Sequence, residues 1–577
     1  MSDLTSCPLD CFDACRVTVT LEGKLRGDKS HPITRGYLCP NLNHYHEYPR
    51  IKTPSFRGKE ITIEEALNRL KIQLKNSKPH EVLYYRGSGN LGLMQRSTEH
   101  FFGGFNAIGT SGSLCDGAGE AGIIAGRGKN YPLSPEMIAQ SEVVIVWGKN
   151  PHTSHSHLLP FLEGKILIVI DPMKTVLAQK ADLHIQIRPH GDLHLALLLS
   201  RFAMIERIHD VEFCEMFAST YEEYYELTQS LRIKATLESI DVSLHQIGEV
   251  LSLIHGKKTV VLVGTGVQKY RNGDEVLRAI DGFAVLMGLF GKEGCGVSFL
   301  GNSTESLKIP FNRCAKKVPK PTVDFAKYKT VFVQGANPLA QMPSSVRVEE
   351  GFKKVEFTIY FGLFENETSR CADLVIPAQN FLEKNDVRSS YGDFTCEMMP
   401  QILEPSWGIS EYALSAFLCR EFGIAIEDEA HYLEGFKGQI EYSDGIGYRH
   451  DSPLIPYCDG FGEDEFQFLE EASLEFGTQE GFYLLTNKHP RGLNSQFYRD
   501  TKVYFHPDTG FESGEQVVLE TQHGNAQMEV ALDERLRGDC LLIYAGNPLV
   551  NRLTPPWISY EGENAVYQET IIKVTKV

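Results

Sequence analysis

The amino-acid sequence predicts a multidomain α/β protein with a separate, mostly β region at its carboxyl end. Four short apolar runs each end in glycine, asparagine or aspartate: VVIVWGKNP, ILIVIDP, TVVLVGTG and TVFVQGANP. Stretches with helical periodicity alternate with them, as in DLHLALLLSRFAMIERI and GDEVLRAIDGFAVLMGLFG. This alternation is typical of parallel strands joined by helical crossovers. Near the end of the chain, the two-residue period of EQVVLETQHGNAQMEVAL predicts strands instead.

Length and charge limit the function classes. The chain has 577 residues, 42% of them hydrophobic, and this length favours several domains over one core. A formal net charge of −18, spread along the chain, argues against nucleic acid or an anionic membrane as the main partner. We therefore expect a small-molecule substrate and protein partners. No apolar run approaches the roughly 20 residues that a membrane span needs. Because a cysteine already stands at position 7, we expect a cytoplasmic protein, unless a leader was removed.

Four of the thirteen cysteines lie near the amino end: Cys7, Cys11, Cys15 and Cys39. Their spacing, C-x3-C-x3-C-x23-C, matches the all-cysteine ligation of an iron–sulfur cluster. Zinc is a rival, but structural zinc sites prefer paired C-x2-C knuckles. Four unrelated buried thiols are a further alternative, although the proline and aspartates within CPLDCFDAC make this segment a polar loop. The pattern favours an iron–sulfur cluster.

The predicted strands share a chemical pattern at their carboxyl ends. In parallel sheets, ligands lie past these ends, where glycine lets the backbone approach a phosphate and an acid can hold a ribose or base. Two strand ends repeat the form V-x-V-x-G-x-N-P, which indicates two similar nucleotide-like ligands or one ligand with two similar halves. Coincidence between two common turns is the alternative. The residues at this edge are Gly148, Asn150, Asp171, Gly264, Gly266, Gly335 and Asn337.

Two other segments are interpreted as irregular. Residues 441–475 are rich in glycine, proline, aspartate and tyrosine, which is typical of a linker or a surface crossing. The segment NPHTSHSHLLP carries three histidines after a strand, but their spacing fits no recurrent metal site. We expect a polar loop there.

Further motifs follow one another in a definite order. GDKSHPITRGYLC follows the cysteine triplet, and ADLHIQIRPHGDLHLAL, GLFENETSRCADLVIPAQNFLEKNDV and NPLVNRLTPP come later. Their order and spacing resemble the dimethyl sulfoxide reductase superfamily of bis-molybdopterin guanine dinucleotide oxidoreductases, in members with an N-terminal 4Fe-4S cluster. The resemblance implies an iron–sulfur domain, two related Rossmann-like α/β domains and a C-terminal double-psi β-barrel. It places the cluster domain at 1–55, one nucleotide-binding domain at 56–80 plus 325–440, the other at 81–324, a linker at 441–475 and the barrel at 476–577.

The resemblance also implies roles for individual residues. The cysteines at 7, 11, 15 and 39 would hold the 4Fe-4S cluster. Cys115, in GTSGSLCDGAGEAG, would ligate molybdenum or tungsten. Asp116 and Glu120 stand close to it in the sequence, and from this proximity alone we expect one of them to assist proton movement. The bis-molybdopterin guanine dinucleotide would contact Gly148, Asn150, Asp171, Asp192, Gly266, Gly335, Asn337, Thr486, Lys488, Asn494, Ser495 and Gln496.

The implied function is two-electron chemistry on a small substrate, with electrons relayed through the cluster to a ferredoxin or iron–sulfur subunit. Two positions depart from the family pattern. Asn41 follows the fourth cysteine where cluster-bearing members commonly place a lysine nearby, and Asp116 stands where formate dehydrogenases usually carry a histidine. The second departure weakens formate as the substrate. The alternatives are a formate dehydrogenase-like activity, a relay scaffold like the large peripheral subunit of complex I, and a hydratase-like use of the metal as a Lewis acid.

Overall fold

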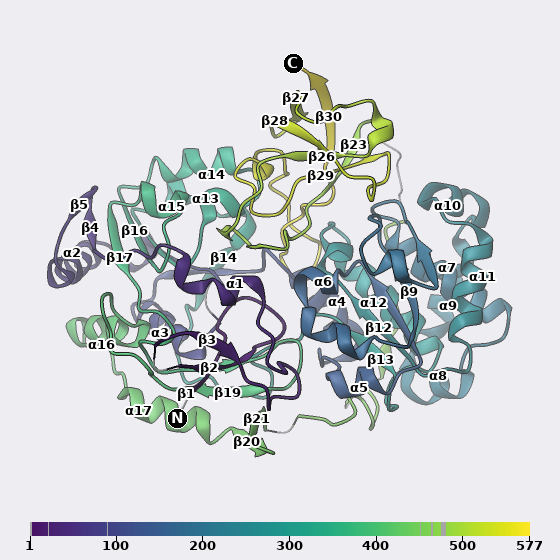
Figure 1. The fold of residues 1–577 in the computed structure, drawn as a ribbon, viewed down its shortest axis with the longest axis horizontal. Coiled ribbons are helices and arrows are strands. Elements are labelled where there is room, and N and C mark those ends of the chain that lie inside the picture. Colours follow the sequence, from purple (N-terminus) through teal and green to yellow (C-terminus); the bar gives the residue numbers. More distant parts are fainter. Residues whose placement is uncertain (1–2, 21, 89–90, 451, 463–464, 475–479) are drawn as a thin grey trace.

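The computed structural model describes residues 3–20, 22–88, 91–450, 452–462, 465–474 and 480–577. Figure 1 shows two α/β regions side by side, with a small sheet near the amino end (purple) between them and a barrel (yellow) above. The structure confirms the α/β multidomain fold with a C-terminal β-barrel. In the described part of the chain, no helix is long and apolar enough to cross a membrane.

One α/β region is built on a five-stranded parallel sheet with the order β10-β9-β8-β12-β13. Every residue of β8 and β12 is buried, because helices cover both faces of the sheet. Alternate residues of β8 enter different cores: Val143 and Ile145 pack toward α7 and α12, whereas Val144 and Val146 pack toward α5 and η4. The strands are β8 (Val143–Trp147), β9 (Ile166–Ile170), β10 (Leu183–Ile185), β12 (Thr259–Val263) and β13 (Gly296–Ser298). The helices are α4 (Gly117–Arg127), α5 (Pro135–Ala139), η4 (Ser156–Phe161), α7 (Asp192–Ile205), α8 (Val211–Phe217), α9 (Tyr221–Ser230), α10 (Ile233–Ile240), α11 (Leu244–Ile254) and α12 (Gly273–Leu286).

The other α/β region is built on an eight-stranded sheet with the order β14-β7-β6-β15-β16-β17-β4-β5, parallel from β14 through β17. Helices α2, α3 and α16 cover one face, and α13 and α14 cover the other. The strands are β4 (Ser55–Phe56), β5 (Lys59–Glu60), β6 (Val82–Arg86), β7 (Ile108–Ser111), β14 (Lys316–Pro319), β15 (Thr330–Gln334), β16 (Phe357–Gly362) and β17 (Leu374–Pro377). The helices are α2 (Ile63–Lys75), α3 (Ser97–Gly104), α13 (Pro338–Gln341), α14 (Ser345–Phe352) and α16 (Glu411–Phe422).

Strand membership differs from the expected division of the chain. β6, β7 and β14 pair in the eight-stranded sheet, whereas residues 81–324 were expected to form one region with the other sheet. An apolar run such as VLYY indicates a buried parallel strand without indicating which sheet receives it. Here Leu83 and Tyr85 pack with Val331 and Val333 of the neighbouring β15.

The small sheet at the amino end carries the cysteine triplet. It is antiparallel and consists of β1 (Asp3–Ser6), β2 (Arg16–Val19) and β3 (Leu25–Gly27). The triplet lies in the connection between β1 and β2, and Cys39 directly precedes α1 (Pro40–Asn43). An antiparallel pair, β18 (Asp386–Ser389) and β19 (Cys396–Met399), packs against β1.

The barrel closes in the order β23-β29-β26-β28-β27-β30 and mixes parallel with antiparallel pairs. Val517 and Leu519 point into its core with no exposed surface, as the two-residue alternation predicted. Its strands are β23 (Phe482–Leu485), β26 (Val503–Phe505), β27 (Gln516–Thr521), β28 (Gly524–Leu532), β29 (Cys540–Leu542) and β30 (Ile571–Lys576).

Residues 441–475, expected as a linker, are partly paired where the structure describes them. A hairpin joins β20 (Ile440–Ser443) to β21 (Ile446–Arg449). Further on, β22 (Phe466–Gln467) pairs with β11 (Ala218–Ser219), and Phe466 and Phe468 are buried in the core around α12. The segment is thus anchored to the five-stranded region by aromatic packing.

Candidate active site

A cavity of about 1140 Å³ is lined by both α/β regions, the barrel and the N-terminal cysteine loop. This volume slightly exceeds the range of about 300–1,000 Å³ that is typical of small-molecule sites. It follows the carboxyl ends of β6, β8, β12 and β15, where parallel sheets place ligands. Of the residues expected to contact metal or nucleotide, those lining it are Cys115, Asp116, Gly148, Asn150, Asp171, Gly266, Gly335, Asn337, Thr486, Lys488, Asn494, Ser495 and Gln496.

The loop that carries Cys115 is held by local hydrogen bonds. Ser113 Oγ accepts from the backbone N–H groups of Cys115 at 2.9 Å and Asp116 at 3.2 Å, and donates to Asp116 Oδ1 at 2.7 Å. Gln268 Nε2 donates to the Cys115 carbonyl at 2.7 Å. These bonds present the thiol to the cavity at the start of α4. Although the Cys115 side chain is exposed to the cavity, the surrounding walls partly remove it from water and raise its pKa to about 12; the Asp116 charge adds to this, and Lys269 opposes it.

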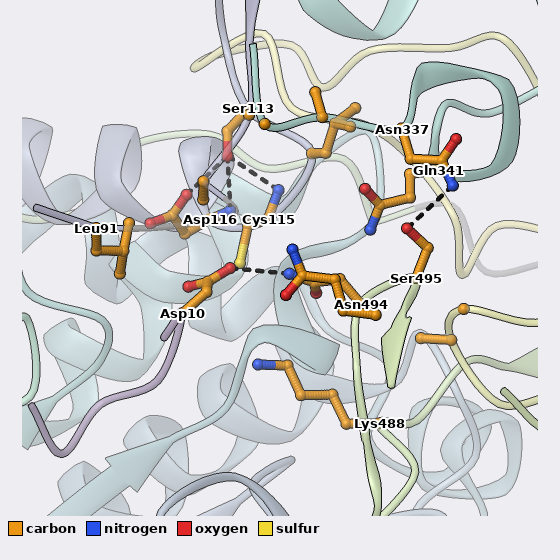
Figure 2. A pocket seen from close by; sticks show the side chains of 18 of the residues that line it. Asp10, Leu91, Ser113, Cys115, Asp116, Asn337, Gln341, Lys488, Asn494 and Ser495 are labelled. Atoms are coloured by element: carbon orange, nitrogen blue, oxygen red, sulfur yellow. Dashed lines mark hydrogen bonds between the residues drawn. The ribbon is translucent and has the colours of Figure 1, made fainter. Parts of the chain in front are cut away.

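Asp10 is brought to the same place by the cysteine loop, which the sequence did not indicate. Its Oδ2 accepts a hydrogen bond from Asn494 Nδ2 at 2.9 Å, and Figure 2 shows its carboxylate close to the Cys115 side chain. The negative charge of Asp10 also contributes to the raised pKa of Cys115. The cysteine loop, the Cys115 loop and the barrel therefore meet at one point of the cavity.

The turn after β8 forms one side of the cavity. Gly148 has φ +58°, and a Cβ there would lie 2.5 Å from Val267 Cγ1. A larger residue at this position would therefore be strained and would force Val267 to move. Asn150 Oδ1 is buried and has no hydrogen-bond partner among the described residues. Asp171 accepts from the Met173 N–H at 2.8 Å. Burial raises the pKa of Asp171 to about 7, and nearby Asp192 adds to the shift.

Asp192 lies outside the cavity lining that the other predicted nucleotide contacts form. Its Oδ1 accepts a hydrogen bond from Trp147 Nε1 at 2.7 Å, and it is absent from the cavity lining. Burial raises its pKa to about 6. Direct contact of Asp192 with a ligand in the cavity, which the resemblance implied, is not supported by this geometry.

The turn after β15 forms the opposite side. Gly335 has φ +53°, and a Cβ there would meet no atom within 4 Å, so the backbone is open toward the cavity. Asn337 Nδ2 donates to Glu367 Oε2 at 2.7 Å and to Ser495 Oγ at 3.1 Å, which ties this turn to the barrel. Gln496 Oε1 is buried without a partner in the described part of the chain. Figure 2 shows Lys488 reaching from the barrel side toward the same space.

The four N-terminal cysteines lie close enough to influence one another. Burial raises the pKa of Cys15, and the charge of Asp13 and then those of the thiols at 7, 11 and 39 raise it further. The Cys7 N–H donates to the Cys15 carbonyl at 2.8 Å, which closes the loop. Four thiols arranged in this way suit an iron–sulfur cluster, which is bound by thiolates.

Two of the histidines expected in a polar loop are instead buried against the cysteine loop. His157 Nδ1 lies 2.9 Å from Asp13 Oδ2, and its Nε2 donates to the Tyr37 carbonyl at 3.1 Å. His155 stacks on Phe12 with ring centroids 4.6 Å apart. Burial opposes a charge on His157, but Asp13 outweighs it and raises the pKa of this imidazole.

The ligand atoms of Asp13, Cys15 and His157 lie within 4.8 Å of one another, which raises the possibility of a mixed metal site. Both ring nitrogens of His157 face acceptor oxygens, so both donate protons and neither offers a lone pair to a metal. We therefore interpret this trio as a hydrogen-bonded ion pair beside Cys15.

Lys149 joins the cysteine loop to the cavity. It follows Gly148, lines the cavity and is only 5% exposed. Its Nζ lies 3.5 Å from the centroid of the Phe12 ring. Burial lowers the pKa of this amine to about 7, although the charge of Asp13 opposes the shift. The sequence analysis did not predict Lys149 as a site residue, because it stands more than a hundred positions from the cysteines.

Comparison with known proteins defines the family. Residues 50–408 match the family described as Molybdopterin oxidoreductase. The chain belongs to this family. It is an oxidoreductase of the dimethyl sulfoxide reductase superfamily, as the motifs indicated. Membership implies a molybdenum or tungsten cofactor bound through pterins.

Several relatives of this molybdopterin oxidoreductase are known. The probable oxidoreductase YoaE of Bacillus subtilis is 25% identical, and the match covers 99% of this chain and 98% of the relative. The assimilatory nitrate reductase catalytic subunit of the same organism is 23% identical over 66% of this chain and 62% of the relative. Acetylene hydratase from Pelobacter acetylenicus has a similar fold, with a TM-score of 0.80 at 17% identity over the whole of both chains.

The cavity of this chain suits such a cofactor. Its Gly335 turn leaves the backbone open to a bulky anionic ligand, and the buried oxygens of Asn150 and Gln496 have no partner among the described residues. Hydrogen-bond donors on a nucleotide or pterin would satisfy these two acceptors. The thiol of Cys115 is a soft ligand suited to a metal that is already bound by sulfur.

Proposed function

We propose that this chain binds molybdenum or tungsten as bis-molybdopterin guanine dinucleotide in the cavity and carries out two-electron chemistry on a small substrate. The observation that supports this most strongly is the position of Cys115. Its thiol faces a cavity that both glycine-rich strand ends line, and Asp10 of the cysteine loop reaches the same cavity. When bound, the cofactor would supply a redox-active metal centre.

Cys115 is the proposed protein ligand to this metal. Partial desolvation in the cavity and the Asp116 charge raise its pKa, so a positive partner favours formation of the thiolate. A bound metal cation is such a partner. Lys269 and Lys488, whose charges lower this pKa, would further stabilise the thiolate and neighbouring phosphates. Gly148 and Gly335 would let backbone N–H groups approach the two pyrophosphates.

Asp116 and Glu120 are the proposed proton carriers. Burial raises the pKa of Glu120 to about 7, with a contribution from the charge of Asp116. Near neutral pH, this carboxyl is therefore divided between its acid and base forms, as a proton-transfer group requires. Burial also raises the pKa of Asp116, although the hydrogen bond from Ser113 opposes the shift. Both side chains line the cavity.

The four N-terminal cysteines are the proposed ligands of one 4Fe-4S cluster, which would pass single electrons to a ferredoxin or an iron–sulfur subunit. Their loop supports this role because Asp10, from the same loop, lies in the cavity beside Cys115. The cluster would thus lie close to the substrate site, because Phe12 of the loop lines the cavity and contacts Lys149, which lines it as well.

The test uses protein purified without oxygen from a host that makes the pterin cofactor. We expect molybdenum or tungsten, a guanine-containing pterin and iron in the wild type, and turnover with a viologen dye as electron donor or acceptor. Cys115→Ser should abolish turnover while the iron content stays unchanged. The control is Cys458→Ser, because this thiol is exposed and lies outside the cavity lining.

Three results would contradict the proposal in different ways. If the holoprotein contains neither molybdenum nor tungsten, the proposed catalytic metal is ruled out. Full electron transfer in Cys115→Ser would support the relay scaffold instead. Substrate conversion that needs no electron donor or acceptor would indicate a hydratase.

A further inference from the structure

Four cationic side chains line the cavity on the side of Cys115 and Asp116, and we call this group the cationic recess. Arg86 ends β6, Arg96 ends η3 (Leu93–Arg96), and Arg313 and Lys320 flank β14. β14, β7 and β6 are neighbours at one edge of the eight-stranded sheet, and the Cys115 loop follows β7. The recess therefore lies over the sheet edge from which the candidate metal ligand projects.

The positive charge of the recess is only partly offset by carboxylates. Within the described ranges, neither hydrogen bond nor ion pair joins these four side chains to a carboxylate, but the charge of Glu99 acts on Arg96 and Lys320, and that of Asp116 acts on Lys320. Burial lowers the pKa of Lys320 to about 8, and repulsion from Arg86 contributes. Burial lowers the pKa of Arg96 to about 10, with repulsion from Arg86 and Arg313. Cations that repel one another around a cavity concentrate anions there.

A neutral donor adds to this environment. Tyr85, the neighbour of Arg86 on β6, lines the cavity and is 1% exposed. Its hydroxyl is buried and has no hydrogen-bond partner in the part of the chain that the structure describes. Lys320 Nζ lies 5.7 Å from the centroid of the Tyr85 ring. A small shift of either side chain would offer this hydroxyl to a ligand held by Lys320.

We propose that the cationic recess binds a small oxyanion and that this oxyanion is the substrate of the Cys115 centre. Guanidinium groups bind planar or tetrahedral oxyanions through two parallel hydrogen bonds, which gives both affinity and orientation. Lys320 and Asp116 line the same cavity, and Lys320 follows β14, the neighbour of the strand β7 that leads into the Cys115 loop. The identification of the oxyanion as a substrate rests on the proposed function above.

The phosphates of the cofactor are the other oxyanions that could occupy the recess. The topology favours the substrate for Arg313 and Lys320, which flank β14, because β7 and β6 separate them from β15 and the proposed nucleotide turn at Gly335. Arg86, in contrast, pairs with Gln334 directly beside that turn. The Gly148 turn belongs to the other sheet. A cofactor phosphate and a substrate nevertheless share one chemistry, so the experiment must separate them.

The experiment measures anion binding and turnover in the wild-type holoenzyme and its variants. Arg96→Gln and Lys320→Gln remove single charges of the recess, and Lys316→Gln is the matched control, because Lys316 is an exposed cation on β14 outside the cavity lining. Nitrate and thiosulfate are the anionic probes, and dimethyl sulfoxide is the neutral one. Direct binding is measured by calorimetry at constant ionic strength, and cofactor content by molybdenum, tungsten and guanine analysis.

We expect the wild type to bind at least one of the anions and to turn it over in preference to dimethyl sulfoxide. Each recess variant should weaken binding and raise KM at least about tenfold, which corresponds to about 1.4 kcal/mol, with a smaller change in kcat. Their metal and guanine content should equal that of the wild type. Arg96→Lys should recover part of the affinity because it restores charge without the forked geometry.

Three other outcomes would overturn all or part of the proposal. Loss of guanine and metal from the recess variants would assign the cations to the cofactor phosphates. Turnover of dimethyl sulfoxide without measurable anion binding would overturn the substrate class. If the purified wild type contains neither metal but its anion binding still depends on Arg96 and Lys320, the redox function fails while the anion site stands.

Discussion

Arg388 Nε donates a hydrogen bond to the carbonyl oxygen of Cys7 at 3.1 Å, across a separation of 381 residues. The same guanidinium donates through Nη2 to the Cys11 carbonyl at 3.1 Å. Its side chain has no exposed surface. Backbone carbonyls thus replace water around a buried charge, and β18 holds the cysteine loop in place.

Replacing Arg388 by methionine should destabilise the protein and impair the cysteine loop. The change leaves the carbonyls of Cys7 and Cys11 buried without these donors, at a cost of about 1–3 kcal/mol for each group. We expect a lower Tm and less iron per chain after anaerobic reconstitution. Arg69→Met is the control, because Arg69 is part-exposed: it pairs with Glu65 one helical turn away, an interaction worth about 0.3–0.5 kcal/mol, and lies over the Phe56 ring. Wild-type Tm and iron content in Arg388→Met would show that the loop does not need this contact.

The glycine turns could be predicted from sequence because they depend on local chemistry. Gly148 and Gly335 each follow a short apolar strand, and both have positive φ in the structure. The barrel could also be predicted, since inward-facing residues such as Val517 and Leu519 alternate with outward-facing ones. These signals extend over fewer than ten residues and do not require knowledge of the tertiary arrangement.

Contacts between distant segments could not be predicted in this way. Asp10 meets Asn494, and His157 meets Asp13, only after the whole chain has folded. Asp192 stands where the resemblance implied a ligand contact, but it hydrogen-bonds Trp147 instead. A sequence pattern identifies a residue type at a strand end or helix start, whereas side-chain direction is decided by packing.

The buried ion pair between Arg127 and Asp281 should be essential for the stability of the region that carries Cys115. Arg127 Nε lies 2.8 Å from Asp281 Oδ2, neither side chain is exposed, and the pair joins α4 to α12. Arg127→Met leaves the carboxylate buried and unpaired, which we expect to cost about 3–5 kcal/mol. The Tm should fall clearly. The double variant Arg127→Met/Asp281→Leu should recover most of the loss, and failure to recover it would show that packing rather than the unpaired charge is responsible.

Asp171 should make the cofactor-free protein less stable as the pH rises. Burial raises its folded-state pKa to about 7, compared with about 3.9 in an unfolded chain. The folded state therefore binds the extra proton, and this stabilisation is full below about pH 4 and lost as the pH rises toward 7. Asp171→Asn stays neutral throughout. We expect the Tm of the variant to exceed that of the wild type more at pH 8 than at pH 5.

Protein made in a host without pterin synthesis allows this comparison, because no nucleotide then reaches the Asp171 carboxyl. Asp459→Asn, an exposed site, is the matched control and should leave the Tm difference between pH 5 and pH 8 unchanged. An equal Tm difference at both pH values in Asp171→Asn would mean that this carboxyl is charged in the folded protein even at pH 5.

Asp10 should act at the reaction centre rather than at the iron–sulfur cluster. It belongs to the cysteine loop, but its carboxylate bonds Asn494 of the barrel and lies beside Cys115 in Figure 2. Asp10→Asn preserves the size of the side chain and removes its charge and basicity. A positioned acid or base typically contributes about 10²–10⁴-fold to a rate, so we expect kcat to fall at least about 100-fold.

The comparison with Asp116→Asn then separates two candidate proton carriers. Asp116 is held by Ser113 within its own loop, whereas Asp10 approaches from a different segment. The iron content and the electron paramagnetic resonance spectrum of the reduced cluster should match the wild type in both variants. If Asp10→Asn instead alters this spectrum while kcat is unchanged, Asp10 supports the cluster and Asp116 remains the proton carrier beside Cys115.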